Sequence, residues 1–296
     1  MKIDGVFSGG GVKAYAFIGA LESIYERKLV FERVAGTSAG SIIAAFLAAG
    51  YPIKEMKQLV QHLDLKKFLD PPRLTKYIPA SKWLFLYLQM GLYKGNQFED
   101  WLYDQLAKRN IYTFSDLRDG YLKVVVSDLT LGKLVVIPDD LQRLYNLNPK
   151  YFPVAKAVRM SSGFPYFFMP KKLLGKTKEK SLIVDGGLLS NFPLWIFKKE
   201  DEKSRRPVLG VKLSESTEKS RPHKIKNSLD MLHALFLTMK QAHDARYISE
   251  SKKNNIIFIP VDHIDATDFH LSEEMKKNLM KIGKQRAKAF LNHWPR

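Results

Sequence analysis

Two stretches of the sequence decide the fold: residues 2–14 read KIDGVFSGGGVKA, and residues 30–50 read VFERVAGTSAGSIIAAFLAAG. Each begins with a short apolar run typical of a buried strand and passes through small residues into a helical pattern. The first turn is a glycine loop, and the second carries Ser38 between Gly36 and Gly40. A strand, a tight turn and a helix, repeated in this way, indicate neighbouring parallel strands in an α/β sheet.

The same alternation continues to the end of the chain. Short β-branched runs predict strands at 2–7, 31–35, 121–127, 133–137, 181–184, 208–212 and 256–259. Longer periodic or apolar runs predict helices at 12–27, 38–50, from Pro52 onward, and at 97–109, 151–160, 229–249 and 273–291. No internal repeat and no interdomain linker interrupts the pattern. We therefore predict a single domain over residues 1–296 with a three-layer α/β/α architecture and a mostly parallel central sheet.

Composition limits the classes of protein to consider. With 296 residues, 45% of them hydrophobic, the chain is long and apolar enough for a large core. It has no cysteine, which excludes disulfides and thiolate metal sites and fits a reducing compartment. Its first residues lack the basic-then-apolar layout of a signal peptide. We expect a cytoplasmic location, with peripheral contact at a membrane.

The charge of the chain points to an anionic partner. Lysine and arginine number 48 and aspartate and glutamate 30, a net charge of +18, which attracts nucleic acid, anionic lipid or acidic partners. No zinc-finger spacing, aromatic RNA-binding motif or basic heptad region occurs, so we expect no nucleic-acid partner. An anionic bilayer fits the charge equally well. No apolar run reaches the roughly 18 residues that a membrane-spanning helix needs.

The glycine loop Gly9-Gly10-Gly11-Val12-Lys13-Ala14 has three interpretations. It fits a loose dinucleotide fingerprint, in which the following helix binds a pyrophosphate. It also fits an oxyanion hole, in which the same N–H groups bind a developing alkoxide. A plain turn without a ligand is the third. Against the dinucleotide, Glu32 lies at the start of the second strand, whereas the ribose-binding acidic residue belongs at its end.

Ser38 lies in the context of a nucleophile elbow. The pattern Gly36-x-Ser38-x-Gly40 follows a strand and precedes an apolar helix, although an ordinary N-cap serine would share this spacing. None of the seven histidines occupies a persuasive triad position. Asp185, followed by Gly186 and Gly187, ends a predicted strand, where α/β sheets place their sites. A simple Asp-Gly turn is the alternative for that segment.

Together these motifs make the chain resemble the patatin-like phospholipases, lipid acyl hydrolases with a Ser–Asp dyad. The resemblance rests on the glycine loop, on Gly36-Thr37-Ser38-Ala39-Gly40, on Asp185-Gly186-Gly187, on the block 157–165 before the aspartate and on Asn191-Phe192-Pro193. It runs from the first strand to the final helix. One departure is Ala14, where the family usually has glycine; we expect activity to survive it.

The resemblance implies a mechanism and a set of site residues. Ser38 is implied as the nucleophile and Asp185 as its base. Gly9, Gly10 and Gly11 form the implied oxyanion hole, and Lys13 orders the loop or meets a phosphate. The implied activity is ester hydrolysis of phospholipase A or lysophospholipase type on a phospholipid or another fatty-acyl ester. Neither a metal nor an organic cofactor is required.

Two other functions and two segments stay open. The chain could be a non-catalytic, basic, lipid-binding protein with the same fold, or an enzyme that binds a dinucleotide through its glycine loop. Residues 83–93 (WLFLYLQMGLY) favour a core helix, with an interfacial or lid segment as the alternative. Residues 171–180 (KKLLGKTKEK) are most simply a solvated loop, although their lysines could draw the protein to an anionic membrane.

Overall fold

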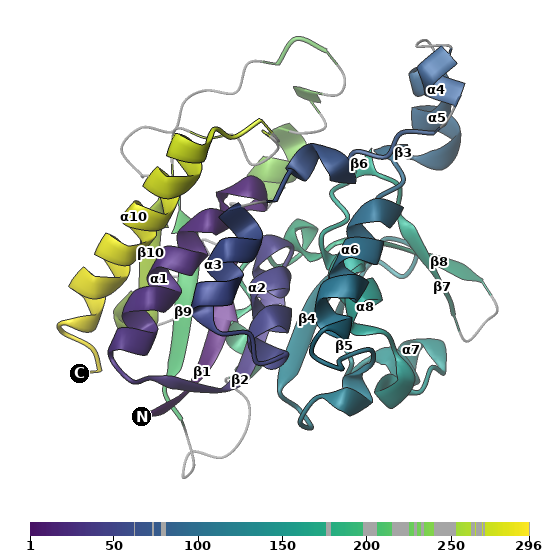
Figure 1. Cartoon of the computed structure of the whole chain (residues 1–296). Helices are drawn as coiled ribbons and strands as arrows, with labels where there is room; N and C mark the ends of the chain where they lie inside the picture. The colour runs from purple at the N-terminus through teal and green to yellow at the C-terminus, as the bar shows by residue number, and fades with distance from the viewer. Residues whose placement is uncertain are drawn as a thin grey trace.

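The structure is a computed structural model that describes residues 1–61, 63–72, 74–77, 81–175, 179–197, 206–214, 225–227, 230–231, 234–239, 253–261, 264, 268 and 270–295. Its main sheet contains β1 (Lys2–Phe7), β2 (Val30–Thr37), β4 (Leu122–Asp128), β5 (Lys133–Ile137), β7 (Lys171–Leu174), β8 (Lys180–Asp185), β9 (Val208–Ser214) and β10 (Ile256–Pro260). The strand order is β10-β9-β1-β2-β4-β8-β7, with β5 also paired to β4 (Figure 1).

The sheet is parallel on one side and antiparallel on the other. β10, β9, β1, β2 and β4 pair in parallel, whereas β5 and β8 run antiparallel to β4, and β7 antiparallel to β8. All seven predicted strands are present. β7 was not predicted, and the interpretation of 171–174 as loop is wrong, because β8 supplies hydrogen-bond partners that the local sequence does not reveal. β3 (Gly91–Tyr93) and β6 (Tyr166–Phe168) form a separate two-stranded sheet. The mixed α/β fold with a mostly parallel central sheet is confirmed.

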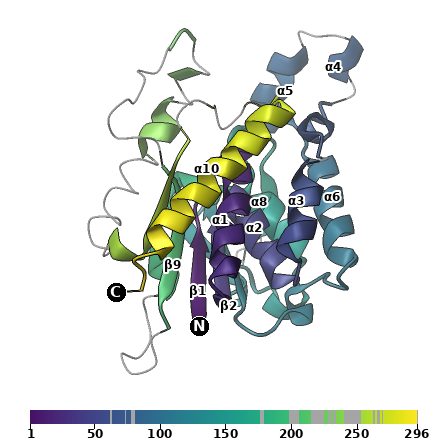
Figure 2. The ribbon, with the colours of Figure 1, turned by 60° about the vertical axis from the view of Figure 1, so that its left-hand side comes forward.

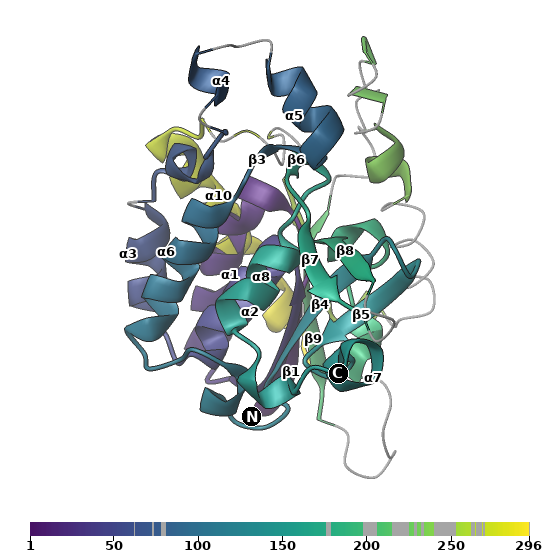
Figure 3. The same cartoon turned by 90° about the vertical axis from the view of Figure 1, so that its right-hand side faces the viewer.

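One face of the sheet is covered by a layer of helices (Figure 3). These are α1 (Tyr15–Glu26), α2 (Ala39–Ala48), α3 (Ile53–Gln61), α6 (Asn96–Ala107), α8 (Val154–Ser161) and α10 (Glu273–Leu291). The other helices are α4 (Leu74–Tyr77), α5 (Ser81–Gln89) and α7 (Leu141–Tyr145), with 3₁₀ turns η1 (Gly11–Ala14), η2 (Leu65–Phe68), η3 (Phe114–Asp116), η4 (Pro149–Tyr151), η5 (Gly186–Leu188), η6 (Leu194–Phe197) and η8 (Lys253–Asn255). The predicted helix 151–160 begins only at Val154, because Pro153 precedes it at the N-cap. Most of the predicted helix 229–249 lies outside the described residues; its part 234–239 is helical.

Apolar side chains fill both sides of the sheet. The larger cluster lies under the helical layer and includes Phe7, Phe17 and Phe46. The apolar helix predicted over 38–50 is present as α2, and most of its residues are buried. A smaller cluster on Val6 and Ala35 is closed by Phe192 and η6. In the part of the chain that the structure describes, Phe192 and the single 3₁₀ turn η6 thus cover the apolar side chains on this face.

α1 and α10 lie side by side along the outer edge of the helical layer (Figure 2). The Ser272 hydroxyl caps the N-terminus of α10 by accepting from the Met275 N–H at 3.2 Å. Glu22 on α1 binds Lys57 at 2.8 Å and Lys284 on α10 at 3.3 Å. Burial raises the pKa of the Glu22 carboxyl, but the hydrogen bonds and charges of the two lysines outweigh burial, and the net pKa is lowered.

The register along β4 is what brings the site together. Thr37, the last residue of β2, pairs with Val125, and Asp185, the last residue of β8, pairs with Val126. Because β5 pairs with Val124 to Asp128 on the other edge of β4, β2 and β8 share one edge and meet end to end. Asp185 ends a strand, as predicted. Because β8 is antiparallel to β4, it approaches the end of β2 from the opposite direction.

The segment 83–93 does not belong to the core. Trp83 is 66% exposed and Tyr87 83% exposed, and α5 projects from the body of the molecule together with α4 (Figures 1 and 3). The favoured interpretation as a core helix is therefore wrong. A short segment that is apolar on all sides has no hydrophobic periodicity that would indicate which neighbour covers it. The described contacts of α5 are mainly with α4 and β3.

Candidate active site

Ser38 occupies a strained turn between β2 and α2. Its φ of 52° and ψ of −127° lie where a residue with a side chain is uncommon. Gly40 makes the turn feasible, because a Cβ atom there would lie 2.6 Å from the carbonyl carbon of Phe7 and from the carbonyl oxygen of Ser8. The backbone thus holds the Ser38 side chain outward at the N-terminus of α2, in the way a nucleophile elbow does.

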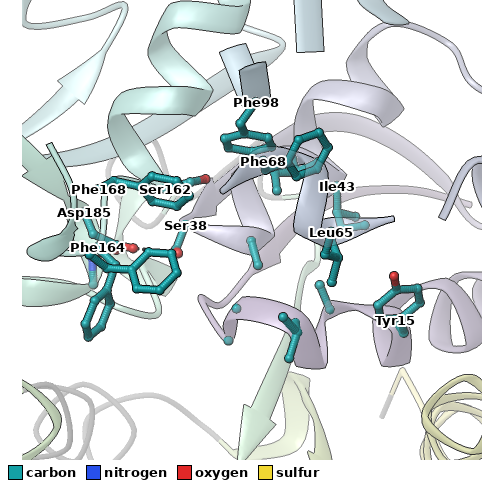
Figure 4. Close-up of a pocket in the computed structure, with 18 of the residues that line it drawn as sticks. Tyr15, Ser38, Ile43, Leu65, Phe68, Phe98, Ser162, Phe164, Phe168 and Asp185 are labelled. Atoms are coloured by element: carbon teal, nitrogen blue, oxygen red, sulfur yellow. Dashed lines mark hydrogen bonds between the residues drawn. The ribbon is translucent and has the colours of Figure 1, made fainter. Parts of the chain in front are cut away.

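Ser38 and Asp185 meet directly. The Ser38 hydroxyl donates to Asp185 Oδ2 at 2.7 Å (Figure 4), while Asp185 Oδ1 accepts from the Gly187 N–H at 2.7 Å. Asp185 is 3% exposed. Two residues 147 positions apart therefore form a serine–carboxylate pair, and the turn that follows the aspartate fixes the orientation of its carboxylate.

The glycine loop lies beside this pair, but its three N–H groups are not equivalent. Gly9 N–H donates to the Asn191 carbonyl oxygen at 2.9 Å and is occupied by the fold. Gly10 and Gly11 line the same pocket as Ser38, and Gly9 is not among the residues that line it. A Cβ atom on Gly9 would lie 3.1 Å from the Ser38 Cβ, which shows how closely the loop approaches the turn. Of the three predicted donors, Gly10 and Gly11 are the two in the pocket wall.

Ser161 supports the turn from the far side, and no role was predicted for it. Its hydroxyl accepts from the Ser38 N–H at 2.9 Å and donates to the Val125 carbonyl oxygen at 2.6 Å. Ser161 is fully buried at the end of α8. It lies in the block 157–165 that contributes to the family resemblance, which was the one signal that could have drawn attention to it.

An apolar pocket extends from the Ser38–Asp185 pair and encloses about 170 Å³. On α2 its wall is Ala39, Ile42, Ile43 and Phe46, which share one helix face. From Ala39 to Phe46 this wall runs about 10 Å at 1.5 Å per residue. Aromatic rings from η2, α6 and the segment after α8 close the other sides; they are Phe68, Phe98, Trp101, Phe164, Phe167 and Phe168. The cavity suits an alkyl chain.

Tyr15 lies at the end of the pocket away from Ser38 (Figure 4). It is 5% exposed, and within the described part of the chain its hydroxyl has no hydrogen-bond partner. Behind it, the Lys276 ammonium lies 5.6 Å from the ring centroid. Burial, with a smaller contribution from the Glu273 carboxylate, raises the pKa of Tyr15 well above its usual value, so the phenol is neutral under physiological conditions.

Arg159 is fully buried and holds one wall of the pocket in place. It donates from Nε to the Gly95 carbonyl oxygen at 2.9 Å and from Nη2 to the carbonyl oxygens of Lys94 at 2.8 Å and Met169 at 3.2 Å. Its guanidinium lies 4.7 Å from the ring centroid of Phe168. Burial lowers the pKa of Arg159 to about 10, so the side chain is still a cation at neutral pH. The sequence did not single it out.

The remaining predicted residues occupy definite places. Lys13 is buried in η1 and is not among the pocket-lining residues, whereas Ala14 is half-buried and lines the pocket. Glu32 binds Lys2 at 3.0 Å near the start of β2, away from the Ser38 turn. Within the described residues no histidine lines the pocket, and no group of three His, Asp or Glu side chains is arranged to hold a metal ion.

The basic segment 171–180 lies only partly within the described structure. Lys171 binds Glu99 at 2.5 Å, Lys172 and Lys180 are exposed on β7 and β8, and Lys176 and Lys178 lie outside the described residues. The predicted role of these lysines in membrane attraction stays a prediction.

Comparison with known proteins gives the site its context. The family described as patatin-like phospholipase matches residues 5–198. An uncharacterized protein of Bacillus subtilis, YqhO, is 50% identical over 295 residues, which cover 99% of each chain. An intracellular phospholipase A2 of Caenorhabditis elegans is 27% identical over 201 residues, covering 62% of this chain and 15% of the nematode protein.

Solved structures share the fold. VipD from Legionella pneumophila superposes with a TM-score of 0.58 at 19% identity, over 98% of this chain and 66% of VipD. ExoU from Pseudomonas aeruginosa, in complex with SpcU, gives a TM-score of 0.54 at 16% identity, over 98% of this chain and 52% of the other. The chain thus spans just under two thirds of VipD and about half of ExoU. The family match extends from the first strand past Asp185 to the 3₁₀ turn η6, and on this ground the chain belongs to the patatin-like phospholipase family.

Proposed function

We propose that this protein hydrolyses carboxylic esters of lipids, as a phospholipase A or lysophospholipase, through a Ser38–Asp185 dyad. Membership of the patatin-like phospholipase family supports lipid acyl hydrolase activity. The observation that carries the finer proposal is the 2.7 Å hydrogen bond from the Ser38 hydroxyl to Asp185 Oδ2 at the end of an apolar pocket. A nucleophile, a base and a compartment for an alkyl chain are the three parts that acyl transfer from lipid needs.

In the first half of the proposed reaction, Ser38 Oγ attacks the ester carbonyl carbon as its proton passes to Asp185 Oδ2. The carbonyl oxygen becomes an oxyanion, which accepts hydrogen bonds from the N–H groups of Gly10 and Gly11. We leave Gly9 out of this role because its N–H already donates to Asn191. As the tetrahedral intermediate collapses, the carbon–oxygen bond to the leaving alcohol breaks and Asp185 returns the proton to that oxygen. An acyl-serine remains.

In the second half, Asp185 takes a proton from a water molecule as the water oxygen attacks the acyl-serine carbonyl. Collapse releases the fatty acid and returns the proton to Ser38 Oγ. A carboxylate is intrinsically a weaker base than an imidazole, so geometry and oxyanion stabilisation must supply much of the rate. The Gly187 N–H on Asp185 and the Ser161 hydroxyl on the Ser38 backbone support that geometry.

The pocket supports a fatty-acyl substrate and indicates its reach. Its wall along α2 is about 10 Å long, which accommodates roughly eight carbons of an extended chain at about 1.3 Å per bond. We expect kcat/KM on p-nitrophenyl esters to rise from acetyl to octanoyl. Lys13 is proposed to order the glycine loop, since it is buried in η1 and away from the pocket.

The test is release of fatty acid from a panel of phospholipids and lysophospholipids by the purified full chain. We expect Ser38→Ala and Asp185→Asn each to lower kcat by at least about 1000-fold, with fluorophosphonate labelling lost in Ser38→Ala. Ser115→Ala and Asp119→Asn, at exposed positions, are the matched controls and should keep full activity. Full activity in Ser38→Ala would refute the dyad. Vesicle binding without any fatty-acid release would favour the non-catalytic lipid-binding alternative, and a nicotinamide-induced shift in melting temperature without probe labelling would favour a dinucleotide enzyme.

A further inference from the structure

The helices α4 and α5, together with Met90, form a projecting segment that we call the arm. It extends beyond the carboxyl ends of the parallel strands, at the end of the molecule where Ser38 lies (Figures 1 and 3). Three aromatic side chains of the arm lie largely in solvent: Tyr77 is 79% exposed, Tyr87 83% and Trp83 66%. Its other exposed large apolar residues are Leu74, Leu84, Leu88 and Met90. An apolar group of this size on a surface marks an interaction site.

The sequence of the arm carries charge of one sign, although Asp70 lies at its base, where its carboxylate accepts from the Asn96 N–H. Residues 71–95 contain four basic residues and no acidic residue, within a chain of net charge +18. Lys66 and Lys67 are exposed where the chain leaves the body toward the arm, and Lys94 where it returns. Exposed tryptophan and tyrosine side chains with lysines near them are typical of an interfacial membrane anchor. In such an anchor the rings enter the headgroup layer and the cations meet anionic lipid.

The arm is attached directly to the wall of the pocket. It is inserted between η2 and α6, and the flanking residues Phe68 and Phe98 pack with ring centroids 5.1 Å apart while both line the pocket. The described helical residues 234–239 at the same end repeat the arrangement, because Phe236 lines the pocket and Leu235 is 53% exposed. Apolar side chains that line the pocket thus lie beside the arm in the sequence, at Phe68 and Phe98, and within 234–239 next to one that faces solvent.

We propose that the arm is the surface by which this protein docks on an anionic lipid bilayer, with Trp83 and Tyr87 inserted at the headgroup level. Docking there brings the pocket wall at Phe68 and Phe98 to the membrane, so that an acyl chain passes from bilayer to pocket without crossing water. The purpose of docking rests on the proposed hydrolase function; the docking itself does not. Among the described residues, no helix is long and apolar enough to cross a membrane.

A vesicle-binding experiment tests the surface. The full chain carrying Ser38→Ala, so that the vesicles stay intact, is sedimented with phosphatidylcholine vesicles with and without 30 mol% phosphatidylglycerol, at low and high salt. We expect binding to the anionic vesicles that weakens as salt rises. Adding Trp83→Ser and Tyr87→Ser should reduce the partition coefficient at least tenfold. The matched control is Tyr151→Ser, which removes a tyrosine that is 72% exposed on η4, before the start of α8, and should change binding less than twofold.

A second measurement locates the inserted ring without disturbing the fold. Brominated phosphatidylcholine quenches a tryptophan that enters the bilayer, and the chain has four tryptophans. We expect quenching of the Ser38→Ala protein on mixed vesicles, and loss of most of it in the added variant Trp83→Phe, which retains an aromatic ring and should still bind.

The outcomes separate this inference from the proposed function. Equal binding with and without the two serine substitutions on the arm, or equal loss with Tyr151→Ser, overturns the docking surface. The docking surface is also overturned if the substitutions change only the oligomeric state, because the arm would then bind a second copy. If the wild-type protein binds vesicles through the arm but releases no fatty acid, the hydrolase proposal fails and the docking surface stands.

Discussion

The contact between α1 and α10 offers a demanding test of how this fold positions its site. A Cβ atom on Gly19 would lie 2.7 Å from the carbonyl carbon of Met280 and 2.9 Å from the Lys284 nitrogen. From the other helix, a Cβ atom on Gly283 would lie 2.8 Å from the carbonyl carbon of Ala16. Carbon atoms in contact are normally about 3.5–4.0 Å apart. Gly19→Ala must therefore push the two helices apart by about 1 Å.

Two effects of Gly19→Ala oppose each other, and their magnitudes decide the sign. Alanine is favoured over glycine within a helix by about 1 kcal/mol. Overpacking costs about 1–3 kcal/mol or more, and here the cost lies at the upper end, because the obstructing atoms are backbone and cannot rotate away. We expect Gly19→Ala to lower the free energy of unfolding by about 2 kcal/mol. Because α1 follows the glycine loop, a shift of about 1 Å should also lower kcat tenfold or more.

Urea unfolding followed by circular dichroism measures the stability change. Asn278→Ala, at an exposed position of α10, is the control for helix propensity and should stabilise by about 0.5 kcal/mol. The double variant Gly19→Ala/Gly283→Ala should cost less than the sum of its parts, because the second methyl enters helices that the first has already separated. If Gly19→Ala proved as stable as the wild-type protein, the close packing of the α1 backbone on the α10 backbone would be refuted.

Three further predictions concern other contacts and are tested by urea unfolding. Arg159→Met leaves three carbonyl groups without their donor and should destabilise the protein by about 3–5 kcal/mol. Arg159→Lys should recover part of this loss. A cost of Arg159→Met below about 1 kcal/mol would contradict the three hydrogen bonds that the structure shows for Arg159. Glu22→Gln should lower the free energy of unfolding by about 0.5–1 kcal/mol at pH 7. Because the folded-state pKa of Glu22 is lowered, the stability difference between variant and wild type should shrink as the pH falls below about 4.3. A stability difference that stays constant across this range would disprove the pairing of Glu22 with the lysines. Tyr15→Phe should leave the free energy of unfolding unchanged or raise it, because it removes a buried hydroxyl without a described partner. Tyr51→Phe loses a 2.6 Å hydrogen bond and should cost about 1 kcal/mol. Equal costs for the two substitutions would argue against this difference in hydrogen bonding.

Local signals made most of the fold predictable. The runs at 2–7 and 133–137 are strands with the predicted bounds, and 273–291 is a helix with the predicted bounds, because β-branched runs and a capped amphipathic period act over a few residues. β7 was not recognised because its residues, KKLL, show neither a β-branched run nor a strict alternation, although its partner β8 begins only six residues after β7 ends. Contacts between residues far apart in the chain leave no local signal at all. Ser161, for example, contributes through a contact with residue 38 across 123 positions.

For the candidate site, the sequence indicated which residue types to consider but not how the fold brings them together. The sequence singled out a serine and a carboxylate by their chemistry and by the turns beside them, and the two side chains lie together. Their meeting depends on β2 and β8 sharing one edge of β4, which no pattern within either strand encodes. The glycine loop illustrates the same point at atomic scale. Three glycines share one sequence motif, yet the fold engages the N–H of Gly9, and this could be known only from the structure.

The prediction that residues 83–93 form a core helix failed for a physical reason, and that reason bears on function. Periodicity reports which side chains are apolar and not what covers them, and within the described structure α5 contacts chiefly α4 and β3. Leaving a large apolar side chain in water forgoes about 1.5–3 kcal/mol of burial. Trp83, Leu84, Tyr87 and Leu88, all more than half exposed, thus represent several kcal/mol that folding does not recover. On the proposed docking surface, a bilayer interface would recover this free energy, so the arm would stabilise the membrane-bound state of a protein that takes its substrate from a bilayer.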